Sequence, residues 1–260
     1  HRHRDPTDLR LYSLVALILC AASVLQGMVG FAAGLLAIPL LVLVAGVGMP
    51  EAIMTVLISA FLQNAGGLFH LRGQIVWREA LGPIIIRIAF IPIGVGALFL
   101  TTHLPDQQIK MVLGAVLLVL VLMQQLLAPK DTSVELRPIW KWIAFSSSGF
   151  LVGFCGMGGP PMVMWVMAQK WTSAKSRAFL FCLFLSRLVP HCLLLYFTFG
   201  DVIGKAAFTA LLCVPWIIGG TWAGLLLGNR LPKHRLRILV FWILVLTALS
   251  AIAAPFWQPP

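Results

Sequence analysis

A cluster of glycines and prolines interrupts an apolar part of the chain. Residues 153–161 read GFCGMGGPP. Glycine permits backbone conformations and close approaches that other residues forbid, and proline suits the first turn of a helix, where its missing N–H costs little. A helix that restarts after the cluster has free N–H groups at its N-terminus, and these attract anions. The cluster therefore predicts an anion-binding turn made by Gly156, Met157, Gly158 and Gly159.

Two arginines and a histidine lie inside apolar runs of the sequence. Arg87 stands in GPIIIRIAFIPIGVG and Arg187 in FLFCLFLSRLVPHCLLLYF, where His191 follows one helical turn later on the same face. An arginine inside a bilayer costs at least about 2.5–3.5 kcal/mol and usually faces a cavity or a partner. The eight acidic residues all lie in tails, loops or the ends of apolar runs. We therefore expect both arginines to bind an anionic ligand.

Other roles remain open for these three residues. Either arginine could bond to helix-end carbonyls or snorkel to the interface. His191 could join the site, carry a proton or sit as a hydrogen-bonded core residue. Gln26 and Asn64 are further polar candidates, although such residues more often bond one helix to another.

The composition excludes an ordinary soluble domain. Of the 260 residues, 60% are hydrophobic and 10% are charged, whereas soluble domains have roughly 25% charged residues. A membrane-spanning helix needs about 20 apolar residues, and no alternating barrel pattern is present. The sequence predicts an all-α polytopic membrane protein. Its apolar runs are 11–48, 52–69, 80–100, 111–128, 142–168, 178–199, 206–228 and 238–256.

The formal net charge of +11 is explained by membrane topology. In a soluble protein such a charge suggests nucleic acid, but here Lys and Arg gather in short loops between apolar runs. We expect a lipid bilayer and a small anionic substrate as partners, and no nucleic acid. The five cysteines lie in apolar runs without CxxC spacing. We therefore expect no metal and no cofactor.

The chain reads as two copies of one unit. GFAAGLLAIPL at 30–40 matches GMGGPPMVMWV at 156–166, and Leu104-Pro105 matches Leu231-Pro232 at almost the same offset. We expect a first membrane repeat at 11–127, a cytoplasmic linker at 128–138 and a second repeat at 139–256. By this correspondence Gly30, Phe31 and Gly34 take the place of the second glycine cluster.

Loop charges predict that the two repeats are inverted. Basic residues gather around 72–78, 130–141, 170–177 and 230–237, which positive-inside topology assigns to the cytoplasm. The 27-residue run 142–168 then has to enter and leave on one side, as a hairpin of two half-helices. If 11–48 does the same, each repeat is such a hairpin followed by three spans. The basic N-terminus, with Arg2, Arg4 and Arg10, disagrees with its outside position in this arrangement.

Inverted repeats with broken helices are typical of secondary transporters, whose substrates bind near the bilayer midplane. The candidate substrate-binding residues are Gln26, Gly30, Phe31, Gly34, Asn64, Arg87, Gly156, Met157, Gly158, Gly159, Arg187 and His191. No membrane carboxylate is present to couple protons or sodium. The membrane potential, which favours outward movement of a monoanion, is then the simplest driving force.

Two glycine-led repeats that end in a Leu-Pro turn and a final span resemble the TauE/SafE permeases. The resemblance covers about residues 12–252, with Gly156-Met157-Gly158-Gly159 and Pro39 matching the family pattern and Ala32 and Ala33 standing where the family tends to have glycine. It implies export of sulfite, sulfonates such as sulfoacetate, or related anions across the bacterial inner membrane.

Several other functions compete with this interpretation. An anion channel, or an uptake permease for a small carboxylate, would use a similar site. A membrane-embedded assembly factor would carry no flux. An enzyme is not expected, because the histidines lack HExxH spacing and the SSSG run at 146–149 is not GxSxG.

Overall fold

The computed structural model describes residues 9–29, 33–126, 137–230 and 233–257, and within these ranges it contains helices and no strand. The α-helices are α1 (Leu9–Val29), α2 (Ala33–Leu43), α3 (Met49–Leu71), α4 (Trp77–Thr101), α5 (Asp106–Leu126), α6 (Pro138–Cys155), α7 (Gly159–Met167), α8 (Ser173–Ser186), α9 (Leu188–Phe199), α10 (Asp201–Leu212), α11 (Val214–Arg230) and α12 (Lys233–Trp257). A single 3₁₀ turn, η1 (Arg72–Gln74), joins α3 to α4.

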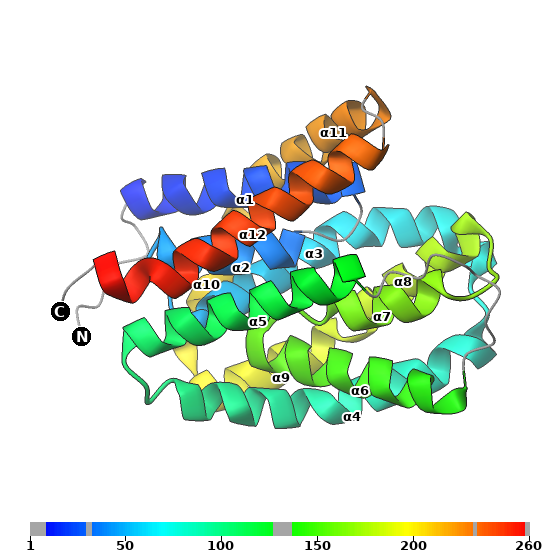
Figure 1. Ribbon diagram of the computed structural model, residues 1–260, viewed down its shortest axis with the longest axis horizontal. Helices are drawn as coiled ribbons and strands as arrows, with labels where there is room; N and C mark the ends of the chain where they lie inside the picture. The colour runs from blue at the N-terminus through cyan, green and yellow to red at the C-terminus, as the bar shows by residue number, and fades with distance from the viewer. Residues whose placement is uncertain (1–8, 30–32, 127–136, 231–232, 258–260) are drawn as a thin grey trace.

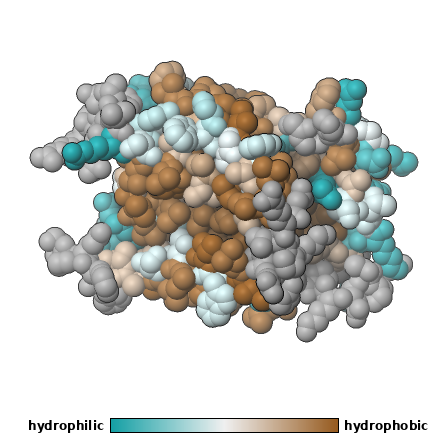
Figure 2. Space-filling view, turned by 90° about the horizontal axis from the view of Figure 1, so that it is seen from above, coloured by the Kyte–Doolittle hydropathy of each residue, from teal (hydrophilic) through white to brown (hydrophobic). Residues whose placement is uncertain are grey.

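The helices run along the long axis of the molecule, as a bundle that crosses a bilayer would (Figure 1). Four described spans are long and apolar enough to cross: Arg10–Met28, Trp77–Thr101, Asp106–Leu126 and Ser173–Phe199. The bent pair α10 and α11 makes a fifth if it is one span. Hydrophobic residues cover the middle of the face in Figure 2, and hydrophilic ones lie at both ends. The protein is therefore a polytopic helical membrane protein.

Each glycine cluster follows a long helix and precedes a short one. The sequence predicted two half-helices in 11–48 and in 142–168. The structure instead has 21 residues in α1 and 11 in α2, and 18 residues in α6 and nine in α7. At 1.5 Å per residue, α1 has the length of a full span. The first partner of each pair extends past the apolar run because its polar end, at Arg10 or Lys141, is also helical.

Two of the predicted spans in the second half are broken by proline. The span Ser173–Phe199 changes from α8 to α9 at Arg187, three residues before Pro190. The next span bends by 54° between α10 and α11, at Cys213 and just before Pro215. Proline lacks the N–H that would bond four residues back, which accounts for both breaks.

Close glycine contacts join helices from opposite halves of the chain. A Cβ added to Gly224 of α11 would meet the backbone of Val24 in α1, and one added to Gly153 would meet Ile91 of α4. In both pairs the residue numbers rise together, so α1 is parallel to α11 and α6 is parallel to α4. Helices α5 and α12 pack side by side as a third pair (Figure 1).

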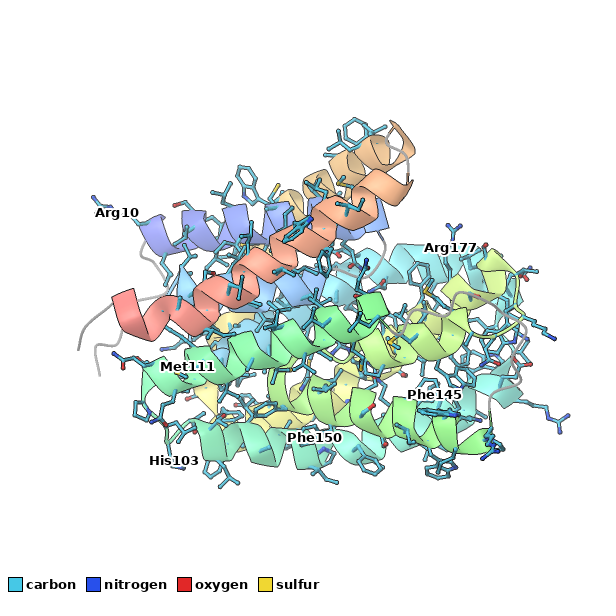
Figure 3. The ribbon with its side chains drawn as sticks, viewed as in Figure 1. Arg10, His103, Met111, Phe145, Phe150 and Arg177 are labelled. Carbon is cyan, nitrogen blue, oxygen red and sulfur yellow. The ribbon has the colours of Figure 1, made fainter. Side chains whose placement is uncertain are left out.

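The end of the bundle that carries more basic residues lies opposite the end that carries fewer. Arg177 lies at one end, and Arg10 and His103 lie at the other (Figure 3). The start of α1 and the end of α12 lie at the same end as Arg10 (Figure 1). At the Arg177 end, the Lys175 ammonium lies 2.7 Å from a Glu79 carboxylate oxygen, which ties α8 to α4.

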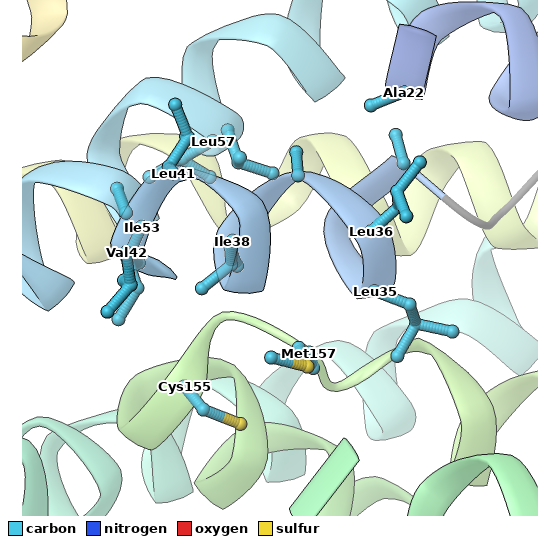
Figure 4. Packing of buried hydrophobic residues seen from close by; sticks show 14 of the residues in the cluster. Ala22, Leu35, Leu36, Ile38, Leu41, Val42, Ile53, Leu57, Cys155 and Met157 are labelled. Atoms are coloured by element: carbon cyan, nitrogen blue, oxygen red, sulfur yellow. The ribbon is translucent and has the colours of Figure 1, made fainter. Parts of the chain in front are cut away.

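The short helix α2 lies in the centre of the hydrophobic core. Leu35, Ile38 and Leu41 are almost completely buried. The turn between α6 and α7 faces them, with Met157 against the side chains of α2 (Figure 4). The core therefore holds α2 against the turn between α6 and α7.

Candidate functional site

The turn between α6 and α7 is held in place by a left-handed glycine and a buried serine. Gly156 ends α6 with φ of 72°, a conformation that strongly favours glycine. Its N–H donates to the carbonyl of Val152, as at many helix C-termini. The Ser148 hydroxyl donates to the carbonyl of Gly158. The predicted break therefore occurs at the glycine cluster, and its geometry is defined by hydrogen bonds.

A cavity of about 30 Å³ lies where the two short helices begin. Its lining includes seven of the predicted site residues, which come from α1, α2, α3, the α6–α7 turn, α7 and the α8–α9 break. These residues are Gln26, Gly34, Asn64, Gly156, Met157, Gly159 and Arg187. The structure thus brings together residues that are up to 161 positions apart in the sequence, from Gln26 to Arg187.

The glycines of the two halves meet at this cavity. A Cβ added to Gly34 would lie 3.6 Å from the Gly156 carbonyl oxygen. A Cβ added to Gly159 would meet no atom within 4 Å. Gly34 therefore lies against Gly156 at ordinary van der Waals distance, and the space beside Gly159 is open.

The helix N-termini offer fewer free donors than the sequence pattern implies. Pro160 and Pro161 have no N–H, so the first turn of α7 contributes only the amides of Gly158 and Gly159. At the start of α2, the Ala33 N–H already donates to Gln26 Oε1 at 3.1 Å. Gln26 therefore caps α2, which sets the edge of the cavity.

Arg187 supplies a formal charge to the cavity lining. It lies at the α8–α9 break, where its side chain is 5% exposed and its Nε has no hydrogen-bond partner among the described residues. Asn64 also lines the cavity, but its amide nitrogen donates to the Ala60 carbonyl at 2.6 Å. The chemistry of the described lining is therefore that of a cationic, donor-bearing site.

Arg87 and His191 do not line the cavity. Arg87 is 1% exposed, and its Nη1 donates to the Leu183 carbonyl at 2.6 Å. His191 is 0% exposed, and neither ring nitrogen has a partner among the described residues. Arg87 lies in α4 and His191 lies in α9, one turn after Arg187, and neither belongs to the cavity lining.

The remaining predicted site residues are a glycine that does not line the cavity and two residues that the structure does not describe. Gly158 faces α6, where an added Cβ would meet the Ser148 carbonyl and Val152. Gly30 and Phe31 lie outside the described residues. Gly158 is therefore a packing glycine, in contrast to Gly159.

Two residues at the site were missed by the sequence analysis. Phe184 lines the cavity, and its ring centroid lies 5.8 Å from the Arg87 guanidinium carbon and 5.9 Å from that of Arg187. Ser148 orders the turn through its bond to Gly158. Neither residue carries a signal in the sequence, since Phe184 is one of 16 phenylalanines and Ser148 stands in a run of three serines.

Comparisons with known proteins support a transport function. The family model described as "Sulfite exporter TauE/SafE" matches residues 14–251. No curated protein and no solved structure matches the chain significantly. The family model covers most of the sequence, including both glycine clusters and all described residues of the cavity lining. The chain belongs to the sulfite exporter TauE/SafE family, and this membership indicates a multi-pass membrane transporter for sulfite or related sulfur anions.

Proposed function

We propose that the protein exports a small sulfur-containing anion, sulfite or a sulfonate such as sulfoacetate, which binds in the cavity between α2 and α7. The observation that carries the proposal is the meeting of Arg187 with both half-helix N-termini at one cavity. No acidic residue contributes to that lining. A cationic site without a carboxylate selects anions over cations.

The charge pattern of the described acids supports this choice. Glu51 accepts from the Gly48 N–H at 2.7 Å, Glu79 pairs with Lys175, and Asp106 and Asp201 begin helices. Each of these four carboxylates lies at a helix start, away from the cavity. The positive charge at Arg187 is therefore available to a ligand.

The cavity favours a compact anion. A water molecule needs roughly 10–15 Å³ of such space, so a cavity of about 30 Å³ suits a group with few heavy atoms. Sulfite and the sulfonate head of an organic anion meet this limit. A bulky organic tail requires the cavity to widen.

We further propose that the two halves form an inverted repeat in a bacterial inner membrane. The parallel pairs α1–α11 and α4–α6 are consistent with such symmetry. In the repeat, α1 corresponds to α6 and α11 corresponds to α4. If the two halves are exchanged, the pair α1–α11 therefore becomes the pair α6–α4. The binding cavity then lies near the midplane, between the short helices of the two repeats.

The membrane potential is the proposed driving force. Moving a monoanion out of a negative interior gains about 2.3 kcal/mol per 100 mV. None of the residues that line the described cavity is a carboxylate that could carry a coupled proton. Net export should therefore follow the potential.

Flux from proteoliposomes tests the function. Vesicles are loaded with labelled sulfite, sulfoacetate or taurine, and efflux is followed with and without an inside-negative potential. We expect saturable efflux of at least one anion that rises with the potential. Flux that follows a pH gradient and ignores the potential would contradict the driving force. An absence of flux for all three compounds would contradict the substrate class.

A further inference from the structure

A cluster of buried nitrogen atoms that have no hydrogen-bond partner among the described residues lies beside the cavity. The atoms are Nε and Nη2 of Arg87, Nε of Arg187, and Nδ1 and Nε2 of His191. More than 90% of buried polar groups normally have a hydrogen-bond partner. Five unpaired nitrogens on three neighbouring side chains therefore require an explanation by a bound water or ion.

The cluster is built by a break in a helix. In the last turn of α8, just before the break at Arg187, the Leu183 carbonyl accepts from Arg87 Nη1 at 2.6 Å and from the Ser186 hydroxyl at 3.1 Å. This bond holds the Arg87 guanidinium in α4 against the break. One turn later, the His191 N–H donates to the Arg187 carbonyl, which keeps the imidazole in the same region.

The electrostatics of the cluster favour an anion over water alone. Both guanidinium groups remain charged in a protein, and none of the described acids lies beside them. Water would pair the N–H groups without neutralising two buried positive charges. An anion does both.

We propose that Arg87, Arg187 and His191 form a second anion position, distinct from the cavity, that binds a compact oxyanion or a halide. This inference depends on one part of the proposed function, which is that the chain binds anions. Arg187 contacts both positions, because it lines the cavity while its Nε belongs to the cluster. Phe184 forms the boundary, since its ring lines the cavity and lies within 6 Å of both guanidinium carbons.

Binding stoichiometry tests the second position. The purified full chain in detergent and chloride-free buffer is titrated with labelled sulfite, and then with labelled chloride at saturating sulfite. We expect two anions per chain. Two sulfites would identify the ligand of the second position as the oxyanion, and one sulfite plus one chloride would identify it as a halide.

Arg87→Met is the decisive variant. Replacement of a buried charge by an apolar side chain of similar volume is often tolerated, so the variant should fold. It should lose one anion and retain sulfite binding at the cavity. The matched control is Arg78→Met, which removes an exposed arginine from the start of the same helix and should still bind two anions.

His191→Leu provides an independent measurement if Arg87→Met does not fold. It should weaken the second anion at least about tenfold, because a hydrogen bond to a charged group is lost. A single bound sulfite in the wild-type chain, unchanged in both variants, would overturn the second position and leave the proposed function intact. An absence of any bound anion would overturn both.

Discussion

At the scale of single residues, Arg187 is the charge that the proposed substrate meets in the cavity. Arg187→Gln keeps a polar side chain and removes the charge. The loss of charge-assisted hydrogen bonds should lower sulfite affinity by about one to two orders of magnitude. Equilibrium binding measures the effect, and Arg177→Gln is the control because Arg177 is exposed at the start of α8. Equal affinity in the two variants would remove Arg187 from the site.

Gly159 allows a test that leaves the second anion position untouched. Its added Cβ meets no atom within 4 Å, so Gly159→Ala should insert and fold normally. The methyl group would instead occupy part of the small cavity that Gly159 lines, which is space that a bound anion needs. We expect sulfite affinity to fall about tenfold or more.

Gly219→Ala is the control for Gly159→Ala. Gly219 lies on the exposed face of α11 and also has no atom within 4 Å of an added Cβ. Normal binding in both variants would show that the α7 start does not contact the anion. Gly158→Leu is a poorer test, since its side chain would displace the Ser148 carbonyl and disturb the turn.

The residue types at the site could be predicted only where they are unusual. Arg187 stands out because charge is rare in apolar runs, and Gly156 and Gly159 stand out because they are clustered with other glycines and two prolines. Phe184 does not stand out, and its role depends on a three-dimensional position between two arginines. The separation of Arg87 from the cavity likewise depends on the α8–α9 break, whose carbonyl binds its guanidinium.

At the scale of elements, the α6–α7 turn depends on the left-handed conformation of Gly156. Any other residue at this φ costs about 1–2 kcal/mol, and a Cβ would lie 2.5 Å from Ile38 Cδ1 in α2. Gly156→Ala should therefore lower the free energy of unfolding by more than the backbone cost alone. Denaturant unfolding in detergent measures it.

A double variant separates the two causes. Ile38→Val removes Cδ1 and costs about 0.5–1.5 kcal/mol by itself. Combined with Gly156→Ala, the total loss should be smaller than the sum of the single losses, because the steric contact is gone. Strict additivity would exclude the contact between the turn and α2.

Element boundaries were less predictable than element type. Apolar runs identify helices, yet the run 11–48 does not reveal that α1 has 21 residues and α2 has 11. Both helices are apolar, and hydropathy does not reveal the close contact that α1 makes with Gly224 in a distant part of the chain. Pro190 and Pro215 indicate the two breaks in the second half only after the bounds of their spans are known.

At the scale of the whole molecule, the two ends of the bundle should face different compartments. Twelve of the 19 Lys and Arg residues lie in the four basic loops of the sequence, and Arg177 lies at the opposite end from His103 (Figure 3). The positive-inside rule assigns the Arg177 end to the cytoplasm. A membrane-impermeant maleimide should therefore label His103→Cys in intact cells and Arg177→Cys only after permeabilisation.

The parent chain is the control for this labelling. Of its five free cysteines, three are buried and two are partly buried, so its background should be low. The reverse labelling pattern would contradict the orientation. Labelling of both variants in intact cells would contradict the opposite placement of the two ends.

The pairing of α1 with α11 has a consequence for how the chain is made. Gly224 of α11 lies against Val24 of α1, across 200 positions of sequence, and the Tyr12 hydroxyl of α1 donates to the carbonyl of Leu212 at the end of α10. At about 5–20 residues per second, a ribosome needs roughly 10–40 s to reach the partner of α1 after α1 has entered the membrane. During that time the surface that will receive Gly224 has only lipid beside it. A ribosome that stalls before α11 would release a first helix without its neighbour, which makes the nascent chain a target for membrane quality control.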